Sequence, residues 1–187
     1  AGVLADGLLP KQAAQSLAQV YAPKAHGSWA LHRACTTTAV STYALFSSVA
    51  ALLGGPGQSN YSAANACLDA VATWRRVGAR VATSVQWGAW AEVGMAARGA
   101  AAERMAAMEA ASGFGRIGLA LGLGALHLAV LPRSASLVGV VPAQWERMLG
   151  SGEEAPAFLS SMVPIGTTER TVAASIRQRE ACAISLE

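Results

Sequence analysis

The sequence predicts an α/β fold built around a largely parallel β-sheet. Short runs of β-branched and other apolar residues alternate with segments of ten or more residues that have helical periodicity, and glycines and prolines separate them. Helices of this length connect parallel strands through right-handed crossovers. The 187 residues, 53% of them hydrophobic and 13% charged, suffice for one domain with a sizeable core.

The predicted elements alternate along the chain as this fold class requires. Residues 1–4 have the composition of the end of a strand, and Asp6-Gly7 that of a turn. Pro23 is expected to interrupt a helical stretch that begins at Gln12 and resumes at Lys24. Further strands are expected at residues 41–47, 81–86 and 136–141, and further helices at residues 59–76, 101–111, 118–131 and around 145.

Two of these helices allow more detailed predictions. Ser59 or Asn60 is the expected N-cap of the helix that ends near Arg76, and Gly78 is its expected stop. The apolar stretch at residues 117–131 has 15 residues. A membrane span needs about 20, so we expect a buried helix there.

The composition changes near residue 150. Residues 151–156 are rich in glycine, serine, glutamate and proline, and residues 164–168 break regular structure again. We therefore expect a folded domain at residues 1–149 and a linker or tail at residues 150–187 that can lead to another domain.

Charge, cysteine and histidine usage argue against several classes of function. The net charge of +3 is spread along the chain, and Arg75-Arg76 fits the last turn of a helix better than a phosphate-binding patch, so nucleic-acid binding is not expected. The three cysteines and three histidines have no metal-ligand spacing, and we expect His26, His32 and His127 at helix surfaces or boundaries. Unpaired thiols and no visible secretory signal favour a cytoplasmic protein that binds no metal and no membrane.

The most informative stretch runs from the end of one predicted strand into the following helix. Ser48 ends the strand, a loop of small residues follows, and Tyr61 falls in the first helical turn. Asn65 lies four residues further on, so it shares a helix face with Tyr61. Ligands of parallel sheets bind beyond the carboxyl ends of strands. The pattern therefore places a hydroxyl, a phenol and an amide at such an edge.

This stretch resembles the active-site signature of ketoreductase domains in modular (type I) polyketide synthases, which belong to the short-chain dehydrogenase/reductase superfamily. Ser48 precedes Tyr61 by thirteen residues and Asn65 follows it by four, as in that family. The other matching segments are Ala1 to Leu4, Pro23-Lys24, Phe46-Ser47, Gly57 to Asn60, Trp87 to Trp90 and Gly94-Met95. The resemblance covers most of residues 1–149. It implies a Rossmann-like fold without its amino-terminal strands, that is, the carboxyl-terminal part of a ketoreductase domain.

The resemblance also implies a role for each matching residue. The implied catalytic residues are Ser48, Tyr61, Lys24 and Asn65. The implied cofactor-binding residues, with NADPH as the cofactor, are Gly2, Ser47, Lys24, Tyr61, Trp87 and Gly88. The implied substrate-binding residues are Asp6, Leu53, Gln58, Trp90 and Met95. The implied partners are an acyl carrier protein that carries the substrate on phosphopantetheine, and other synthase domains or the missing amino-terminal half.

Elementary chemistry explains why these residue types suit ketone reduction. Hydride transfer leaves negative charge on the carbonyl oxygen, so an acid must deliver a proton there. Tyr61 is a suitable acid if a nearby cation such as Lys24 favours its phenolate. Ser48 can hydrogen-bond and orient the carbonyl oxygen, and Asn65 can hold a water or the lysine in a proton relay.

The segment Gly113-Phe114-Gly115-Arg116-Ile117-Gly118 fits the dinucleotide fingerprint G-x-G-x-x-G, but we reject it as a cofactor site. That fingerprint needs a strand before it and an acidic residue about 20 positions later. Here the preceding residues are helical in composition, and residues 136–141 contain no carboxylate. The family's own glycine-rich loop belongs upstream of Ala1, so we expect this chain alone to be inactive.

The sequence predicts an NADPH-dependent ketoreductase that converts a β-ketoacyl chain to a 3-hydroxyacyl chain within a polyketide synthase. Two alternatives stay open. One is a non-catalytic segment that stabilises a multidomain synthase, and an intact glycine-rich loop in the missing half would argue against it. The other is a free-standing short-chain reductase of a small ketone, against which the linker after residue 150 argues weakly.

Overall fold

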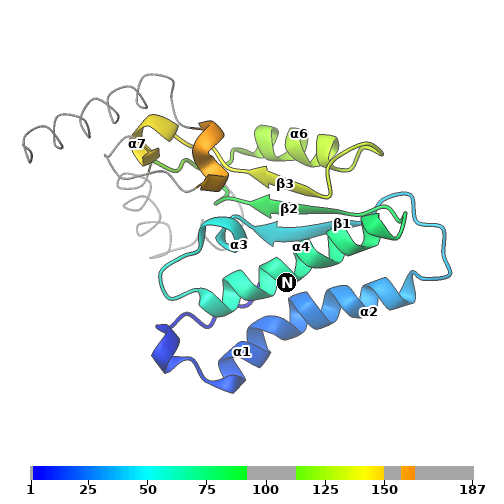
Figure 1. The fold of residues 1–187 in the computed structure, drawn as a ribbon, viewed down its shortest axis with the longest axis horizontal. Helices are drawn as coiled ribbons and strands as arrows, with labels where there is room; N and C mark the ends of the chain where they lie inside the picture. The colour runs from blue at the N-terminus through cyan, green and yellow to red at the C-terminus, as the bar shows by residue number, and fades with distance from the viewer. Residues whose placement is uncertain (1, 92–112, 150–156, 163–187) are drawn as a thin grey trace, which may run out of the picture. The chain divides into compact units, whose positions relative to one another are not determined.

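The computed structural model describes residues 2–91, 113–149 and 157–162 (Figure 1). The chain divides into two compact units, one of Ala1–Ala102 with Arg116–Pro142 and one of Glu103–Gly115 with Ala143–Glu187. The first unit contains the sheet. Met95 and the helix predicted at residues 101–111 lie outside the described residues. The boundary expected near residue 150 stays a prediction.

The first unit is organised by a three-stranded parallel sheet in the order β1-β2-β3. The strands are β1 (Ala44–Ser48), β2 (Thr83–Trp87) and β3 (Leu137–Val140). Each coincides with a predicted strand to within three residues at either end. Phe46 pairs with Val85 and Ser48 with Trp87, so the ends of β1 and β2 are level. The predicted α/β class and the parallel sheet are confirmed.

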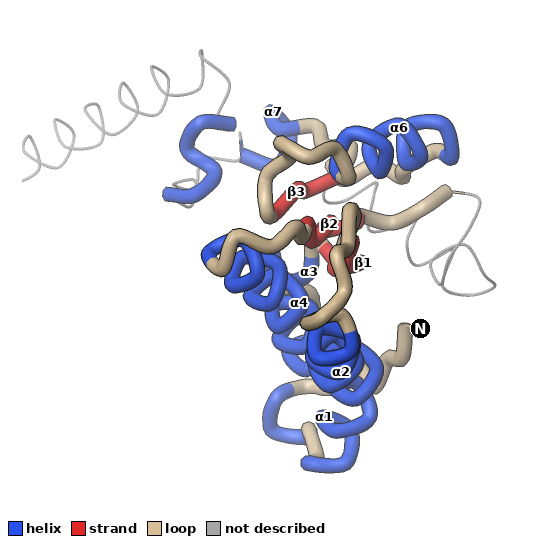
Figure 2. Tube along the Cα trace, turned by 90° about the vertical axis from the view of Figure 1, so that its right-hand side faces the viewer, coloured by secondary structure: helices blue, strands red, loops and turns tan. Residues whose placement is uncertain are grey.

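Helices cover both faces of this sheet (Figures 1 and 2). On one face α4 (Ser59–Val77) packs against β1 and β2, with α1 (Ala14–Tyr21), η2 (Ala22–His26) and α2 (Gly27–Ala34) along its outer side. On the other face α6 (Leu119–Ala129) packs against β2 and β3. The described part of this unit also contains two short helices, η1 (Leu9–Lys11) and α3 (Ala50–Leu53).

Strand alternation separates the core into two parts. Leu45 of β1 points toward α4 and packs with Leu68. Val85 and Trp87 of β2 point the other way and pack with Ala129 of α6. All five residues of β2 are buried, as expected for the central strand of a covered parallel sheet.

Pro23 changes the helix type without ending the helical path. The backbone is α-helical up to Tyr21, continues as the π-helix η2, and becomes α-helical again from Gly27. Proline has no N–H and its ring clashes with the carbonyl four residues earlier, so the turn must widen. The Gly27 N–H accordingly donates to Ala22 O, five residues back. The predicted interruption is thus a wide turn.

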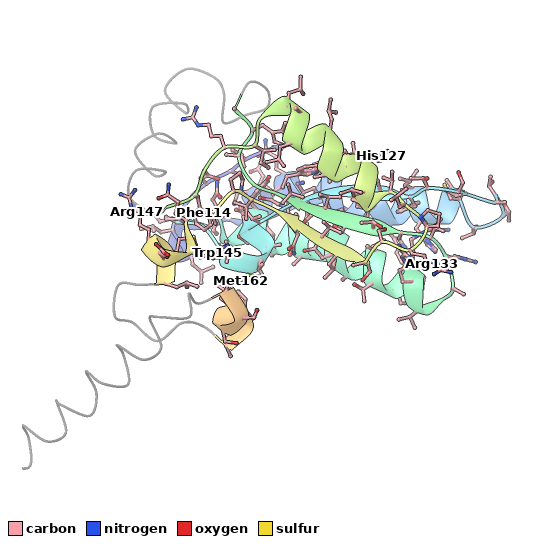
Figure 3. All side chains as sticks on the ribbon, turned by 90° about the horizontal axis from the view of Figure 1, so that it is seen from above. Phe114, His127, Arg133, Trp145, Arg147 and Met162 are labelled. Carbon is pink, nitrogen blue, oxygen red and sulfur yellow. The ribbon has the colours of Figure 1, made fainter. Side chains whose placement is uncertain are left out.

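The predictions of a strand end at residues 1–4 and of a buried helix at residues 117–131 are wrong. Residues 2–4 form no strand, because a strand needs a hydrogen-bonded neighbour and none of the described segments pairs with them. The helix α6, on which Figure 3 labels His127, is not buried. Only Gly122 and Ala129 of α6 are buried, and Leu128 is 64% exposed. The helix rests on the sheet through Ala125, Leu126 and Ala129. Its other leucines, Leu119, Leu121, Leu123 and Leu128, are exposed.

The second unit contributes α7 (Trp145–Leu149) and η4 (Ala157–Met162), and Figure 3 labels Trp145, Arg147 and Met162 on them. Phe114 forms an isolated bridge with Ala143, and the Gln144 N–H donates to Gly113 O at 2.8 Å. The residues from Gly113 to Gly118 carry only isolated bridges and no helix before α6 begins. Within the described part of the chain, no helix is long and apolar enough to cross a membrane.

Candidate active site

The candidate site begins where β1 and β2 end. Ser48 is the last residue of β1 and pairs with Trp87, the last residue of β2. The Ser48 hydroxyl oxygen accepts a hydrogen bond from the Ala50 N–H at 3.2 Å. Since the hydroxyl is the acceptor in this bond, its own proton can be donated to a ligand.

The wide turn at Pro23 places Lys24 against the sheet. Its side chain is 9% exposed, and its ammonium donates to the Phe46 carbonyl oxygen at 3.3 Å. The same nitrogen lies 5.4 Å from the centre of the Tyr61 ring. Burial lowers the pKa of Lys24, and the negative charge of Asp69 partly opposes this effect. The structure therefore places a cation beside the predicted acid.

Tyr61 and Asn65 occupy adjacent turns of α4. The Asn65 Nδ2 donates to the Tyr61 carbonyl oxygen at 2.8 Å, and the Ser47 hydroxyl donates to the Asn65 carbonyl oxygen at 3.3 Å. Lys24, Tyr61 and Asn65 are thus brought together by direct contacts. Ser48 is next to Ser47 in the chain, but its hydroxyl is bonded to the Ala50 N–H and not to these three residues.

Three buried side-chain polar atoms have no hydrogen-bond partner among the described residues. They are the Ser62 Oγ, the Asn65 Oδ1 and the Trp87 Nε1. Buried polar atoms are normally paired with protein, water or ligand, and an orphan costs about 1–3 kcal/mol. The Asn65 Oδ1 is an available acceptor on the α4 side of the sheet, beside Tyr61, and can hold an ordered water. The Trp87 Nε1 is an available donor on the side that α6 covers.

An aromatic wall follows the end of β2. The Trp87 ring lies 5.7 Å from the Phe46 ring and 5.0 Å from the Trp90 ring, measured between centroids. Trp90 also lies against the buried Gly122 of α6 so closely that a Cβ there would overlap the indole. At Gly88 a Cβ would come within 3.1 Å of the Val141 side chain and 3.2 Å of the Val140 carbonyl oxygen, so a larger residue there fits only if these neighbours shift. The predicted ligand contacts of Trp87, Gly88 and Trp90 stay predictions.

A hydrogen-bonded cluster joins the amino-terminal segment to the start of α4. The Asn60 Nδ2 donates to Ala5 O at 2.8 Å and to the Gln12 Oε1 at 3.1 Å. The Gln58 Nε2 donates to the Asp6 Oδ2 at 3.3 Å. Two predicted substrate-binding residues, Asp6 and Gln58, are therefore in contact. Asn60 organises both segments, although the sequence offered it only as an N-cap.

Asn60 is not the N-cap of α4, and neither is Ser59. The helix begins at Ser59, and Gln58 precedes it without a side-chain cap. Asn60 lies inside the first turn, where its Oδ1 accepts from the Tyr61 N–H at 2.7 Å while its Nδ2 donates to Ala5 and Gln12.

The remaining predicted ligand residues have different surroundings. Leu53, at the end of α3, is partly buried, and Gly2 is exposed. Ser47 is 5% exposed and its hydroxyl faces α4, so the main interactions it shows are internal. The structure gives no contact that tests a ligand role for these residues.

His32 is buried, not at a helix surface or boundary as expected. Its side chain is 4% exposed, and its Nδ1 accepts a hydrogen bond from Arg75 Nη1 at 2.8 Å. Arg75 is 2% exposed, and its guanidinium lies 3.8 Å from the Tyr43 ring centre. Arg75 of α4 is therefore an internal link to α2 and to the residue just before β1, and not simply a favourable charge at the end of a helix.

The geometry as a whole suits proton delivery at the carboxyl edge of a parallel sheet. Tyr61 supplies a phenol, Lys24 a nearby cation, Ser48 a hydroxyl with a free proton, and Asn65 an unpaired acceptor. In doubly wound sheets this edge is where ligands bind.

Comparison with known proteins identifies the same type of domain. Residues 1–92 match the family model of the KR domain. The phthioceranic/hydroxyphthioceranic acid synthase of Mycobacterium tuberculosis and the polyketide synthase GfsA of Streptomyces halstedii are each 48% identical over 94 residues. This is 50% of the present chain but only 4% and 1% of those synthases.

Solved ketoreductases share the fold. A structure of A-type ketoreductases from a modular polyketide synthase has a TM-score of 0.76 and 30% identity, covering 93% of this chain and 35% of that one. The first ketoreductase of the tylosin synthase has a TM-score of 0.68 and 36% identity, covering 79% and 32%. The partial coverage fits the expected carboxyl-terminal part of a Rossmann-like domain. The chain therefore carries a ketoreductase (KR) domain of the type found in modular polyketide synthases, matched at residues 1–92.

Proposed function

We propose that this chain supplies the proton-donating part of a site that reduces a β-ketoacyl chain to a 3-hydroxyacyl chain. The hydride donor is NADPH, and the acyl chain is carried on the phosphopantetheine arm of an acyl carrier protein. The observation that carries the proposal is the Lys24 ammonium, buried and 5.4 Å from the centre of the Tyr61 ring at the edge of a parallel sheet. A buried cation in that position favours the phenolate that remains after proton transfer.

Each residue has one task in this reaction. NADPH, when bound, supplies the hydride to the carbonyl carbon. Tyr61 gives its phenolic proton to the carbonyl oxygen as negative charge develops there. Ser48 donates a hydrogen bond to the same oxygen and orients the ketone. Lys24 stabilises the phenolate, and the Asn65 Oδ1 holds a water through which the phenol regains a proton.

The substrate approaches from the side of the Asp6–Gln58 contact. Asp6 and Gln58 are joined at 3.3 Å, and Asn60 fixes the backbone of the segment beside them. Leu53 ends the short helix α3 between β1 and α4. These residues, with Trp90, are proposed to guide the pantetheine arm and to decide which face of the ketone meets the hydride.

A substrate comparison tests the proposal. The complete reductase domain is assayed for NADPH oxidation with a β-ketoacyl pantetheine thioester, a β-ketoacyl carrier protein and a small diffusible ketone. We expect reduction of both thioesters, faster on the carrier protein, and slower reduction of the small ketone. Equal or better activity on the small ketone would indicate a free-standing reductase. No turnover of any ketone, in a folded domain that binds NADPH, would indicate a structural segment.

A further inference from the structure

A buried carboxylate lies between α4 and the sheet, and the proposed mechanism does not use it. Asp69 is 8% exposed. The Ser84 hydroxyl donates to its Oδ1 at 2.6 Å, and the Gln86 Nε2 donates to its Oδ2 at 2.7 Å. Burial of a carboxylate is costly unless hydrogen bonds or an opposite charge compensate for it. Both oxygens accept from neutral donors, so the negative charge itself is left to act on its surroundings.

Strand register places this carboxylate near Lys24. The ammonium of Lys24 is bonded to the carbonyl oxygen of Phe46, and Phe46 is paired with Val85 on the neighbouring strand. The two donors that hold Asp69 are the residues on either side of Val85. Adjacent strands lie about 4.8 Å apart. The ammonium and the carboxylate are therefore anchored at neighbouring points of β1 and β2.

The helix α4 links the same carboxylate to the proton donor. Tyr61, Asn65 and Asp69 follow one another at intervals of four residues, so they share one face of α4. Along this face stand the phenol near Lys24, the unpaired Asn65 Oδ1 and the carboxylate. Opposite charges in a buried environment interact over several ångströms, because little water screens them.

We propose that Asp69 is a positioning residue for Lys24: its buried carboxylate supplies the negative charge that keeps the Lys24 ammonium charged and in place beside Tyr61. Asp69 touches neither substrate nor cofactor in this proposal. The proposal rests on the proposed function only for the catalytic role of Lys24. The charge interaction between Asp69 and Lys24 exists without turnover. The negative charge of Asp69 opposes the lowering of the Lys24 pKa by burial, in agreement with this role.

The elements that pack around Lys24 carry few other charged or titratable groups that could act on it. Tyr61 lies on α4 beside Lys24, and β1 carries no ionisable side chain. On the remaining helices Tyr21 of α1 interacts with Cys67, His32 of α2 pairs with Arg75, and His26 of η2 is exposed.

The two lysines of the chain make a direct measurement possible. Lys11 is exposed and Lys24 is buried, so they give separate signals in the 187-residue chain grown with ¹³C,¹⁵N-labelled lysine. Nuclear magnetic resonance follows the titration of both side chains. The loss of one signal set in Lys24→Arg gives the assignment, and circular dichroism checks the fold of every variant.

Two neutral variants and one control separate charge from structure. In Asp69→Asn and Asp69→Ser, which differ in size so that the test does not depend on one of them folding, Lys24 should titrate at lower pH while Lys11 stays unchanged. Ser84→Ala breaks a hydrogen bond of Asp69 but keeps its charge, so the Lys24 titration should stay close to that of the wild type.

Three results would overturn the proposal. They are an unchanged Lys24 titration in a folded neutral variant, an equal shift in Ser84→Ala, and a wild-type Lys24 that is already uncharged at pH 7. None of these measurements needs NADPH or a ketone. Failure of this inference is therefore distinguishable from failure of the proposed function, which the substrate comparison decides.

Discussion

The pair formed by His32 and Arg75 makes stability depend on pH in a predictable way. The guanidinium of Arg75 can only donate hydrogen bonds, so the Nδ1 of His32 must accept and the ring must be neutral. Burial and the positive charges of Arg75 and Arg80 lower the pKa of His32. The unfolded chain takes up a proton at this histidine below about pH 6.5. Stability that is present at neutral pH is therefore lost as the pH falls below that value.

Two substitutions measure how much the hydrogen-bond acceptor at residue 32 contributes to the free energy of unfolding. His32→Leu fills a similar volume but leaves the guanidinium, which is 2% exposed, without this bond. His32→Gln retains a side-chain oxygen that can accept it. A hydrogen bond to a charged group contributes about 1.5–3 kcal/mol. We therefore expect His32→Leu to be less stable than His32→Gln by about 2 kcal/mol.

The assay is urea unfolding from pH 8 to pH 5, followed by tryptophan fluorescence. The rings of Trp29 and Trp74 lie 5.2 Å and 4.9 Å from the His32 ring, so their emission reports this region. The wild type should lose stability with acid more steeply than His32→Gln, which has no proton to take up at this position. Equal stability of the leucine and glutamine variants, or an equal acid slope in His32→Gln, would refute the reasoning.

Three further predictions concern packing, the amino-terminal segment and stereochemistry. Gly122→Ala should destabilise the chain by about 1–3 kcal/mol because the new methyl group overlaps Trp90, whereas Gly124→Ala, which meets no atom within 4 Å, should be neutral or stabilising in the same urea assay. Asn60→Ala removes both hydrogen bonds by which this side chain holds Ala5 and Gln12, so limited proteolysis should cut the first thirteen residues faster than in the wild type, and an unchanged rate would be contrary evidence. In the family that the chain resembles, D-configured products go with a Leu-Asp-Asp motif and L-configured ones with a tryptophan eight residues before the catalytic tyrosine. Here Leu4-Ala5-Asp6 keeps the final aspartate and Leu53 stands eight residues before Tyr61. We therefore expect a D-configured 3-hydroxyacyl product, and a predominantly L product in chiral chromatography would contradict it.

Local sequence patterns predicted those parts of the fold that depend on local properties. The strands around Leu45 and Val85 are apolar β-forming runs bounded by breakers, and the helix after Gly57 has an apolar face of helical periodicity. The state of residues 2–4 depends on a strand partner, and the burial of α6 depends on which of its faces another element covers. Neither can be read from the composition of the segment itself.

The candidate site also contains residues that local sequence predicts and residues that depend on distant segments of the chain. Ser48, Tyr61 and Asn65 follow from spacing within one strand–loop–helix unit. Lys24 lies 37 residues before Tyr61, so only the family resemblance indicated it. Asp69 was missed because a carboxylate on a helix normally faces solvent, and its two donors come from a strand fifteen and seventeen residues later.

The turnover of Tyr61→Phe in the complete reductase domain tests the central claim most directly. Phenylalanine keeps the ring beside which Lys24 lies but removes the proton that the mechanism delivers. We expect kcat for NADPH-dependent reduction of a β-ketoacyl thioester to fall by about 10²-fold or more, the range of positioned acid–base groups. Cofactor affinity should change much less. A variant that keeps most of its activity would contradict the account, because Tyr61 would then not be the proton donor.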